Sequence, residues 1–257
     1  MPLLIGKVKN QHLDLRNYGI ASGQASALAA GLKHVRDLTS VDLSKNKMQD
    51  GSLAAIVSAL SRKKELVDMA LTHNDAGRAT ARAIESLLGQ PAFMVGLATL
   101  DLTECKLACG GAKSLAMGLL GNATLSKLTL KRNGVGAVGA AAIGEALASN
   151  ATVSELDLSW NVIRGRGAIV LAQSLKGNSS LRKLNLSWNC LHDEGGVAFG
   201  SMLAVNIGLK SLDLSQNNLE EKAGQMLATS FQTNTTIMDM QVRHKQSHFS
   251  LTLHGCF

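Results

Sequence analysis

The residues best suited to do chemistry in this chain are its two tryptophans, Trp160 and Trp188. They are 28 residues apart, and each stands in the same local sequence, L-x-L-S-W-N. If the two segments are equivalent units of one fold, the rings lie about one strand spacing apart and stack. Tryptophan is enriched at binding hot spots because it buries a large apolar area and keeps one polar handle. Two interpretations stay open: an exposed platform for a partner, and mutual packing that covers the turn.

Charged and polar residues around the tryptophans complete the candidate binding site. The expected partner-binding residues are Trp160, Trp188, Asp157, Asp213, Glu155, Lys183, Asn185 and Asp101. Aspartates on one face of a sheet could form a negative track for a basic segment of a partner protein. They could equally be solvated strand residues whose charge keeps a broad sheet face from aggregating.

Enzymatic and metal chemistry are not indicated. The seven histidines are scattered, the four cysteines include no C-x-x-C pair, and the motifs G-x-S-x-G, H-E-x-x-H and G-x-x-x-x-G-K-[ST] are absent. We expect no catalytic residue, no cofactor and no metal site. No apolar run approaches the roughly 18 residues that span a bilayer, and the apolar start of the chain is too short for a signal peptide. We therefore expect no membrane insertion and a cytoplasmic location, with a ciliary or nuclear one still open.

A repeat of 28 residues must position these side chains. Stretches of the form L-x-L-x-x-N recur with one longer interval of 31 residues, and they end at Asn46, Asn74, Cys105, Asn133, Asn161, Asn189 and Asn217. An amide side chain at the end of a strand can satisfy backbone groups of the turn and of the adjacent unit, so these residues are predicted to form a structural ladder. Cys105 would take its place as a small, buried, weakly hydrogen-bonding group, with redox sensing as the alternative.

Each unit also carries a helix signal. Apolar pairs at i and i+4, such as Ile143/Leu147, mark one buried helix face, and a column of alanine and glycine would let the helices lie close to their neighbours. The predicted fold class is an α/β solenoid of about nine repeats. Because helices are wider than the spacing of strands, the stack should curve into a horseshoe segment with the parallel sheet on its concave face and the helices on its convex face. We expect a single domain over 1–257, with degenerate end repeats at 1–37 and 237–257 and regular repeats over 38–236.

Three further features mark the ends and edges of the repeats. A second set of asparagines with 28-residue spacing lies at the other end of the helices and is predicted to end them in the left-handed conformation, at Asn122, Asn150, Asn178, Asn206 and Asn234. A three-residue insertion near 89–96 predicts a protruding loop. Alternating apolar and polar residues over 247–254 predict a capping strand.

The charge distribution favours a protein partner over nucleic acid. The formal net charge is +7, with a pI near 9.4, which permits an anionic partner. The formal charges of the residues expected to be exposed on the concave face nevertheless sum to −2, so the remaining surface carries the excess of positive charge. A nucleic-acid groove needs a contiguous positive track with stacking residues, which this face lacks.

These repeats resemble the leucine-rich repeat proteins, and among them the ribonuclease-inhibitor-like class with its pattern L-x-x-L-x-L-x-x-N/C-x-L. Segments 139–150 and 178–189 look most like the repeats of NOD-like receptors and of repeat-only intracellular proteins, some of them ciliary. The resemblance implies a non-catalytic protein-binding scaffold or adaptor, which we expect to be monomeric by itself. It also admits a structural subunit of a larger assembly such as the ciliary axoneme. A third reading is a small-GTPase regulator similar to the Ran GTPase-activating proteins, whose strongly acidic tail has no counterpart in residues 243–257.

Overall fold

The computed structural model describes residues 8–91, 96–243 and 250–254. Over these residues the chain forms one sheet whose strands follow the order of the sequence. The strands are β1 (Val8–Lys9), β2 (His12–Asp14), β3 (Ser40–Asp42), β4 (Asp68–Ala70), β5 (Thr99–Asp101), β6 (Lys127–Thr129), β7 (Glu155–Asp157), β8 (Lys183–Asn185), β9 (Ser211–Asp213), β10 (Asp239–Arg243) and β11 (Ser250–His254). The helices are α2 (Ser22–Leu32), α3 (Asp50–Leu60), α4 (Arg78–Leu88), α5 (Ala108–Leu119), α6 (Ala137–Ser149), α7 (Gly165–Leu175), α8 (His192–Leu203) and α9 (Glu221–Thr233).

The sheet is parallel from β2 to β10, and every strand residue pairs with its equivalent in the next repeat, as Leu156 does with Leu184. One antiparallel strand is added at each end, β1 on β2 and β11 on β10. In the described part of the chain, nine parallel strands thus alternate with eight helices, which confirms the predicted α/β repeat solenoid. The strand β11 falls within the segment predicted to form a capping strand. Residues 1–7, 92–95 of the insertion, 244–249 and 255–257 lie outside the described residues.

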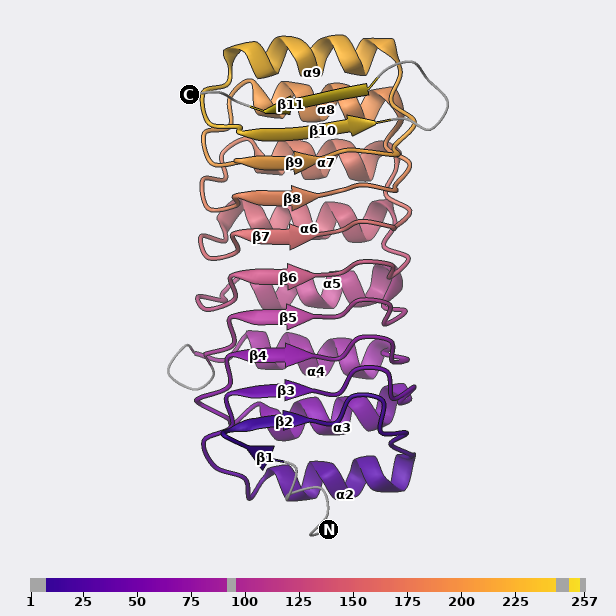
Figure 1. Ribbon diagram of the computed structural model, residues 1–257, viewed down its shortest axis with the longest axis vertical. Coiled ribbons are helices and arrows are strands. Elements are labelled where there is room, and N and C mark those ends of the chain that lie inside the picture. Colours follow the sequence, from indigo (N-terminus) through magenta and orange to yellow (C-terminus); the bar gives the residue numbers. More distant parts are fainter. Residues whose placement is uncertain (1–7, 92–95, 244–249, 255–257) are drawn as a thin grey trace.

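Sheet and helices form two layers with the core between them (Figure 1). The middle residue of each three-residue strand and the two apolar positions of each helix point into this space and, apart from the half-buried Phe231, are almost fully buried, among them Leu156, Ile143 and Leu147. Burying one such side chain contributes about 1.5–3 kcal/mol. Because the strand and helix of a single repeat cannot bury these side chains by themselves, the stability of each repeat depends on its neighbours. No helix in the described residues has both the length and the apolar character needed to cross a membrane.

Neighbouring helices approach closely at the predicted column of small residues. Ala140 and Ala168 are fully buried in this column. A Cβ atom added to Gly196 would lie 2.5 Å from the Cβ of Ala223 in the next helix, closer than atoms can pack. The alanines and glycines therefore set the distance between helices.

A buried side chain after each strand from β3 to β9 ties its repeat to the preceding one. Asn161 donates from Nδ2 to the carbonyl oxygens of Leu158 in its own repeat, at 2.9 Å, and of Leu130 in the preceding repeat, at 3.0 Å. Its Oδ1 accepts the backbone N–H groups of Asn133 and Val135 at 3.0 and 2.9 Å. Four backbone groups that leave the sheet ladder at the turn are thereby satisfied by one amide.

The second asparagine column works differently from the prediction. None of its five residues has a positive φ, and Asn150 and Asn234, which directly follow α6 and α9, are extended. The prediction of left-handed helix caps is therefore wrong. Instead, Asn150 donates from Nδ2 to the carbonyl of Leu119 at the end of the preceding helix, and its Oδ1 accepts the N–H groups of Thr152 and Val153. These residues form a second ladder along the opposite edge of the sheet.

Asp50 links two helices by capping its neighbour. It is the first residue of α3, and its carboxylate accepts the backbone N–H groups of Gly77, Ala79 and Thr80 at the start of α4. Burial alone would raise the pKa of Asp50, but these hydrogen bonds outweigh it and hold the pKa below its ordinary value. Asp193 plays the same part between α8 and α9, where it accepts from Glu220 and Ala223.

Replacing Asn161 by alanine should strongly destabilise the protein. The change leaves buried carbonyl and N–H groups in two repeats without partners, so we expect the free energy of unfolding to fall by about 2 to 4 kcal/mol. The denaturant midpoint followed by far-UV circular dichroism measures the loss. Gln173→Ala on the exposed face of α7 is the matched control and should change little. Equal midpoints for Asn161→Ala and the wild type would contradict the ladder's structural role.

Replacing Asp50 by alanine should cost about 1 kcal/mol of stability at pH 7, as for the loss of a helix N-cap. Because the folded pKa is depressed, the contribution of Asp50 is present above the unfolded pKa of about 3.9 and is lost as pH falls through the folded value. The gap in melting temperature between wild type and Asp50→Ala should therefore close in acid. Asp50→Asn, which can accept hydrogen bonds but does not titrate, should keep the same distance from Asp50→Ala at all pH values.

Candidate partner-binding surface

The face of the sheet turned away from the helices, here called the strand face, carries two exposed rows of side chains, from the first and the third residue of each strand. Over β6 to β10 this face is hollowed, with a volume of about 300 Å³. Its lining includes five of the eight predicted partner-binding residues, namely Glu155, Asp157, Lys183, Asn185 and Asp213. Asp101 lies in the same third-position row on β5 and does not line the hollow.

The first-position row holds an ion triad across three strands. Glu155 on β7 lies between Lys127 on β6 and Lys183 on β8, with carboxylate-to-Nζ distances of 3.4 and 2.9 Å. The hydrogen bond from Lys183, aided by the charge of Lys127, holds the pKa of Glu155 below its ordinary value against the opposing effect of burial. The triad carries one net positive charge, and Asp239 at the same position of β10 brings this side of the hollow to formal neutrality.

Residues of the third-position row order the turn that follows each strand. Asp157 Oδ1 accepts the N–H of Ser159 at 2.8 Å, and Asp213 Oδ1 accepts that of Ser215 at 2.9 Å. Asn185 makes the same bond to Ser187 with its amide oxygen. The repeated spacing of Asp or Asn two residues before Ser or Thr is the sequence signal for this role, which both sequence interpretations of the aspartates missed. Within the described residues, Oδ2 of Asp157 and Oδ2 of Asp213 have no hydrogen-bond or ion-pair partner.

The tryptophans lie just beyond the strand ends and stack on each other. Their ring centroids are 4.1 Å apart and their planes differ by 11°. The Cζ atom of Arg132 lies 4.3 Å from the centroid of Trp160, a cation–π contact. Despite these contacts 36% of Trp160 and 37% of Trp188 stay exposed. Stacking and exposure therefore coexist, and the rings form a supported apolar step at the edge of the sheet.

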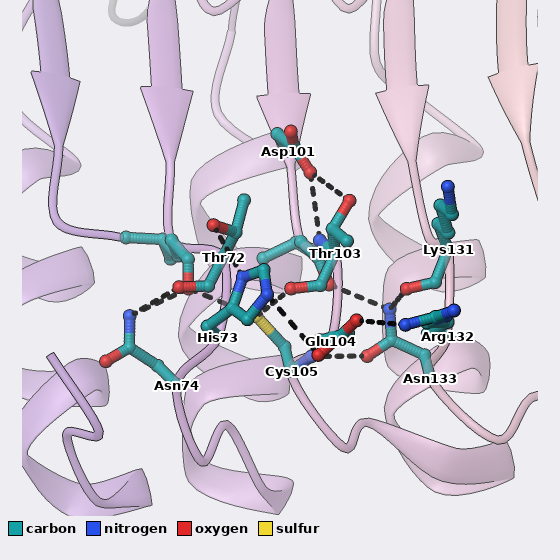
Figure 2. A network of polar contacts seen from close by, with 12 residues as sticks. Thr72, His73, Asn74, Asp101, Thr103, Glu104, Cys105, Lys131, Arg132 and Asn133 are labelled. Atoms are coloured by element: carbon teal, nitrogen blue, oxygen red, sulfur yellow. Dashed lines mark hydrogen bonds and ion pairs between the residues drawn. The ribbon is translucent and has the colours of Figure 1, made fainter. Parts of the chain in front are cut away.

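This step belongs to a longer row, here called the edge row, formed by the residue immediately before each ladder position. Its members are Lys45, His73, Glu104, Arg132, Trp160, Trp188 and Gln216. All have φ between 55° and 61°, the left-handed region, so each side chain leaves the turn in the same way. Glu104 joins its neighbours, with Oε2 3.3 Å from Nε2 of His73 and Oε1 2.9 Å from Nη1 of Arg132 (Figure 2). Sequence reasoning singled out only the tryptophans of this row.

The predicted site therefore divides in two. Glu155, Lys183, Asp157, Asn185 and Asp213 lie at the hollow of the strand face. The two tryptophans lie in the edge row, each three residues after a third-position residue of its own strand. The surface thus has a border of paired charges, an acidic row and an aromatic edge, in that order from the start of the strands to the turn.

Cys105 occupies a ladder position (Figure 2). It is fully buried, and its Sγ donates to the carbonyl of Leu71 at 3.2 Å in the preceding repeat. A thiol offers no amide oxygen, and the N–H of Ala76 bonds to the backbone carbonyl of Cys105 instead. Burial raises the pKa of Cys105 to about 12. A thiol held protonated in this way is a poor nucleophile, which disfavours redox sensing.

Comparison with known proteins assigns the repeat. A family model described as Leucine Rich repeat matches residues 36–57, 121–144, 149–172, 177–200 and 205–228. The solved structure titled Leiomodin-1 Actin-Binding Site 2 (ABS2) is similar with a TM-score of 0.41 and 18% sequence identity, covering 69% of this chain and 86% of its own. No curated protein matches the chain. Among the described residues, no group of three or more histidine, cysteine, aspartate or glutamate side chains is arranged to hold a metal ion.

Cys105 should be inert toward thiol reagents while the protein is folded. Its burial and raised pKa leave almost no accessible thiolate at pH 8, whereas Cys109 and Cys190 are only half-buried. Mass spectrometry of peptides after brief alkylation should find Cys105 modified last, and readily only after denaturation. Modification of Cys105 in the folded protein at the rate of Cys109 would contradict its ladder role.

Proposed function

The chain is a leucine-rich repeat protein, and from this premise we propose that it is a non-catalytic scaffold or adaptor that binds a protein partner across its strand face and edge row. Leucine-rich repeats are typically non-enzymatic modules of protein–protein interaction. Their members share a surface shape and no common chemistry, so the partner must be inferred from the side chains on that surface.

The observation that carries this proposal is the exposed tryptophan pair. Each ring already has one face against an aromatic neighbour, yet about a third of each residue stays open to solvent. Large aromatic side chains at the rim of a shallow hollow are typical of interface hot spots.

The geometry also lowers the entropic cost of binding. The backbone N–H groups of Trp160 and Trp188 donate to the carbonyls of Ser187 and Ser215 in the next repeat, at 2.9 Å in both cases. The ladder asparagine follows each tryptophan directly, and Arg132 supports the outer face of Trp160. A partner that covers these rings therefore meets side chains that are already ordered, which favours affinity.

A second hollow, of about 630 Å³, lies on the helix side between α2 and α3. Small residues such as Ala29, Ala55 and Ser58 line most of it. The half-buried Lys63 in this hollow donates hydrogen bonds to the backbone carbonyls of Lys33 and Val35, just after α2. Its ammonium group therefore already binds the end of the preceding repeat. The hollow offers no exposed aromatic anchor, so we place the partner on the strand face.

The same proposal extends to the organisation of the chain. We propose a single domain over 1–257 of the ribonuclease-inhibitor-like class that works as a monomer in the cytoplasm. The antiparallel strands β1 and β11 support a monomer, because they occupy the edges of the parallel sheet through which another copy could pair. A structural subunit of a larger assembly would use the same surface.

Replacing both tryptophans by alanine should abolish partner binding and leave the fold intact. Hot-spot residues contribute about 2 kcal/mol or more each, so affinity capture from cell lysate should lose the specific partners of the wild type. Melting curves should shift only slightly, because both rings lie outside the core between sheet and helices. Quantitative mass spectrometry of the captured proteins provides the measurement.

The matched control carries Lys33→Ala and Arg62→Ala in the helix-side hollow and should retain all partners. If instead the tryptophan variant captured the same partners and melted at a clearly lower temperature, the rings would serve only the fold. Loss of partners in the Lys33/Arg62 variant alone would place the binding surface on the helix side.

A further inference from the structure

We propose that the strand face takes an extended, proline-rich segment in the polyproline II conformation that carries a basic residue at every third position. This inference rests on the proposed function, because it names the partner of the same surface. Three independent features of that surface support it: the spacing of its carboxylates, their free oxygens, and the positions of the ion triad and the aromatic rings on either side of them.

From β3 to β10, beyond the adjacent Asp14 of β2, acidic residues in the third-position row occur on alternate strands. Asp42, Asp101, Asp157 and Asp213 stand on β3, β5, β7 and β9, with the neutral residues Ala70, Thr129, Asn185 and Gln241 on β4, β6, β8 and β10. Because equivalent residues of neighbouring strands pair in register, the row runs straight across the sheet. Strands are spaced by about 4.8 Å, so successive carboxylates are about 9.6 Å apart.

The regular backbone whose repeat comes nearest to that distance is the polyproline II helix. A polyproline II helix rises about 3.1 Å per residue with three residues per turn, so every third side chain lies on one face at intervals of about 9.3 Å. Side chains on one face of a β-strand recur at about 6.8 Å, and those seven apart on an α-helix at about 10.5 Å. Across Asp101, Asp157 and Asp213 the polyproline II segment departs from register by roughly 0.6 Å, the α-helix by roughly 1.8 Å, and the strand by far more.

These three carboxylates are open to a partner. Each uses Oδ1 to hold its own turn, and among the described residues Oδ2 makes no hydrogen bond or ion pair in Asp101, Asp157 or Asp213. Asp42 is different, because Arg16 forms an ion pair with it at 2.7 Å. The track for a basic segment therefore extends from β5 to β9.

The residues on either side of the track favour the placement of the basic residues and the proline content of the partner segment. On one side, over β6 to β8, the triad of Lys127, Glu155 and Lys183 carries one net positive charge and holds its only carboxylate in ion pairs, so a cation is favoured at the aspartate row instead. On the other side lie the exposed rings of Trp160 and Trp188. Aromatic side chains are the usual platform for polyproline II ligands, whose residues pack on them without a cost of ordering.

Two peptides with the same charge test the spacing. One carries four repeats of Arg-Pro-Pro, and the other four repeats of Arg-Pro-Pro-Pro, in which successive arginines point in different directions around the helix. Fluorescence anisotropy with labelled peptides at about 150 mM salt, where non-specific surface attraction is screened, gives both dissociation constants. We expect the first peptide to bind at least about tenfold more tightly.

The matching protein variant is Asp157→Asn with Asp213→Asn. Asn185 holds the same turn with an amide in the native protein, so these changes remove charge without removing the turn bond. We expect at least about a tenfold loss for the Arg-Pro-Pro peptide and near equality of the two peptides. The control is Asp14→Asn with Asp68→Asn, which removes the same charge from the strand face away from the track and should change binding by less than about twofold.

Equal affinity of the wild type for both peptides, equal effects of the two double variants, or no binding at all would each overturn this assignment of the partner. None of these results would bear on the proposed function, which the tryptophan variant tests with cellular partners. Tight, spacing-dependent binding that disappears in the Asp157/Asp213 variant would support the assignment.

Discussion

A buried carboxamide, placed where the chain leaves its strand in six of the seven regular repeats, supports almost everything on this surface. A strand of three residues makes few ladder bonds, and the turn that follows leaves backbone groups of two repeats in an apolar interior. The side chain of Asn161 satisfies four of them at once, and the other ladder asparagines bond equivalent groups in their own repeats. Leaving these groups unpaired would cost more than a short strand gains by forming, so a repeat that lacks the amide must pair them in another way, as the Cys105 repeat does with its thiol and its backbone carbonyl.

The same constraint sets the binding surface. Because the ladder residue must turn inward, the residue before it takes the left-handed conformation, and its side chain is carried to the sheet edge in every repeat. The positions of the edge row are therefore set by the fold, while the residue types at these positions can change with little effect on the stability of the core. The aspartates Asp157 and Asp213 of the third-position row likewise combine two roles. One carboxylate oxygen accepts a hydrogen bond that orders the turn, and the other can bind a partner. A scaffold of this kind presents ordered side chains at fixed intervals, which is the property a repetitive ligand needs.

Much of the fold follows from the period alone. Once Trp160 and Trp188 are known to be equivalent, their closeness, the parallel strands and the buried helix face all follow. The rest depends on how far side chains reach between repeats. Spacing could not show that Asn150 bonds the preceding helix with its backbone extended, that Asp50 caps the next helix, or that Arg132 covers Trp160. Such contacts depend on rotamers and on the distance between layers, neither of which a repeat pattern contains.

The most direct measurement is the pair of indole N–H signals in an NMR titration with the bound partner. The chain has only two tryptophans, so replacing either one assigns both indole signals. If the strand face and edge row are the binding surface, both indole signals shift or broaden on binding, while the side-chain amide signals of the buried ladder asparagines stay in place. Binding that leaves both indole signals unchanged would contradict the central claim and move the partner to another face.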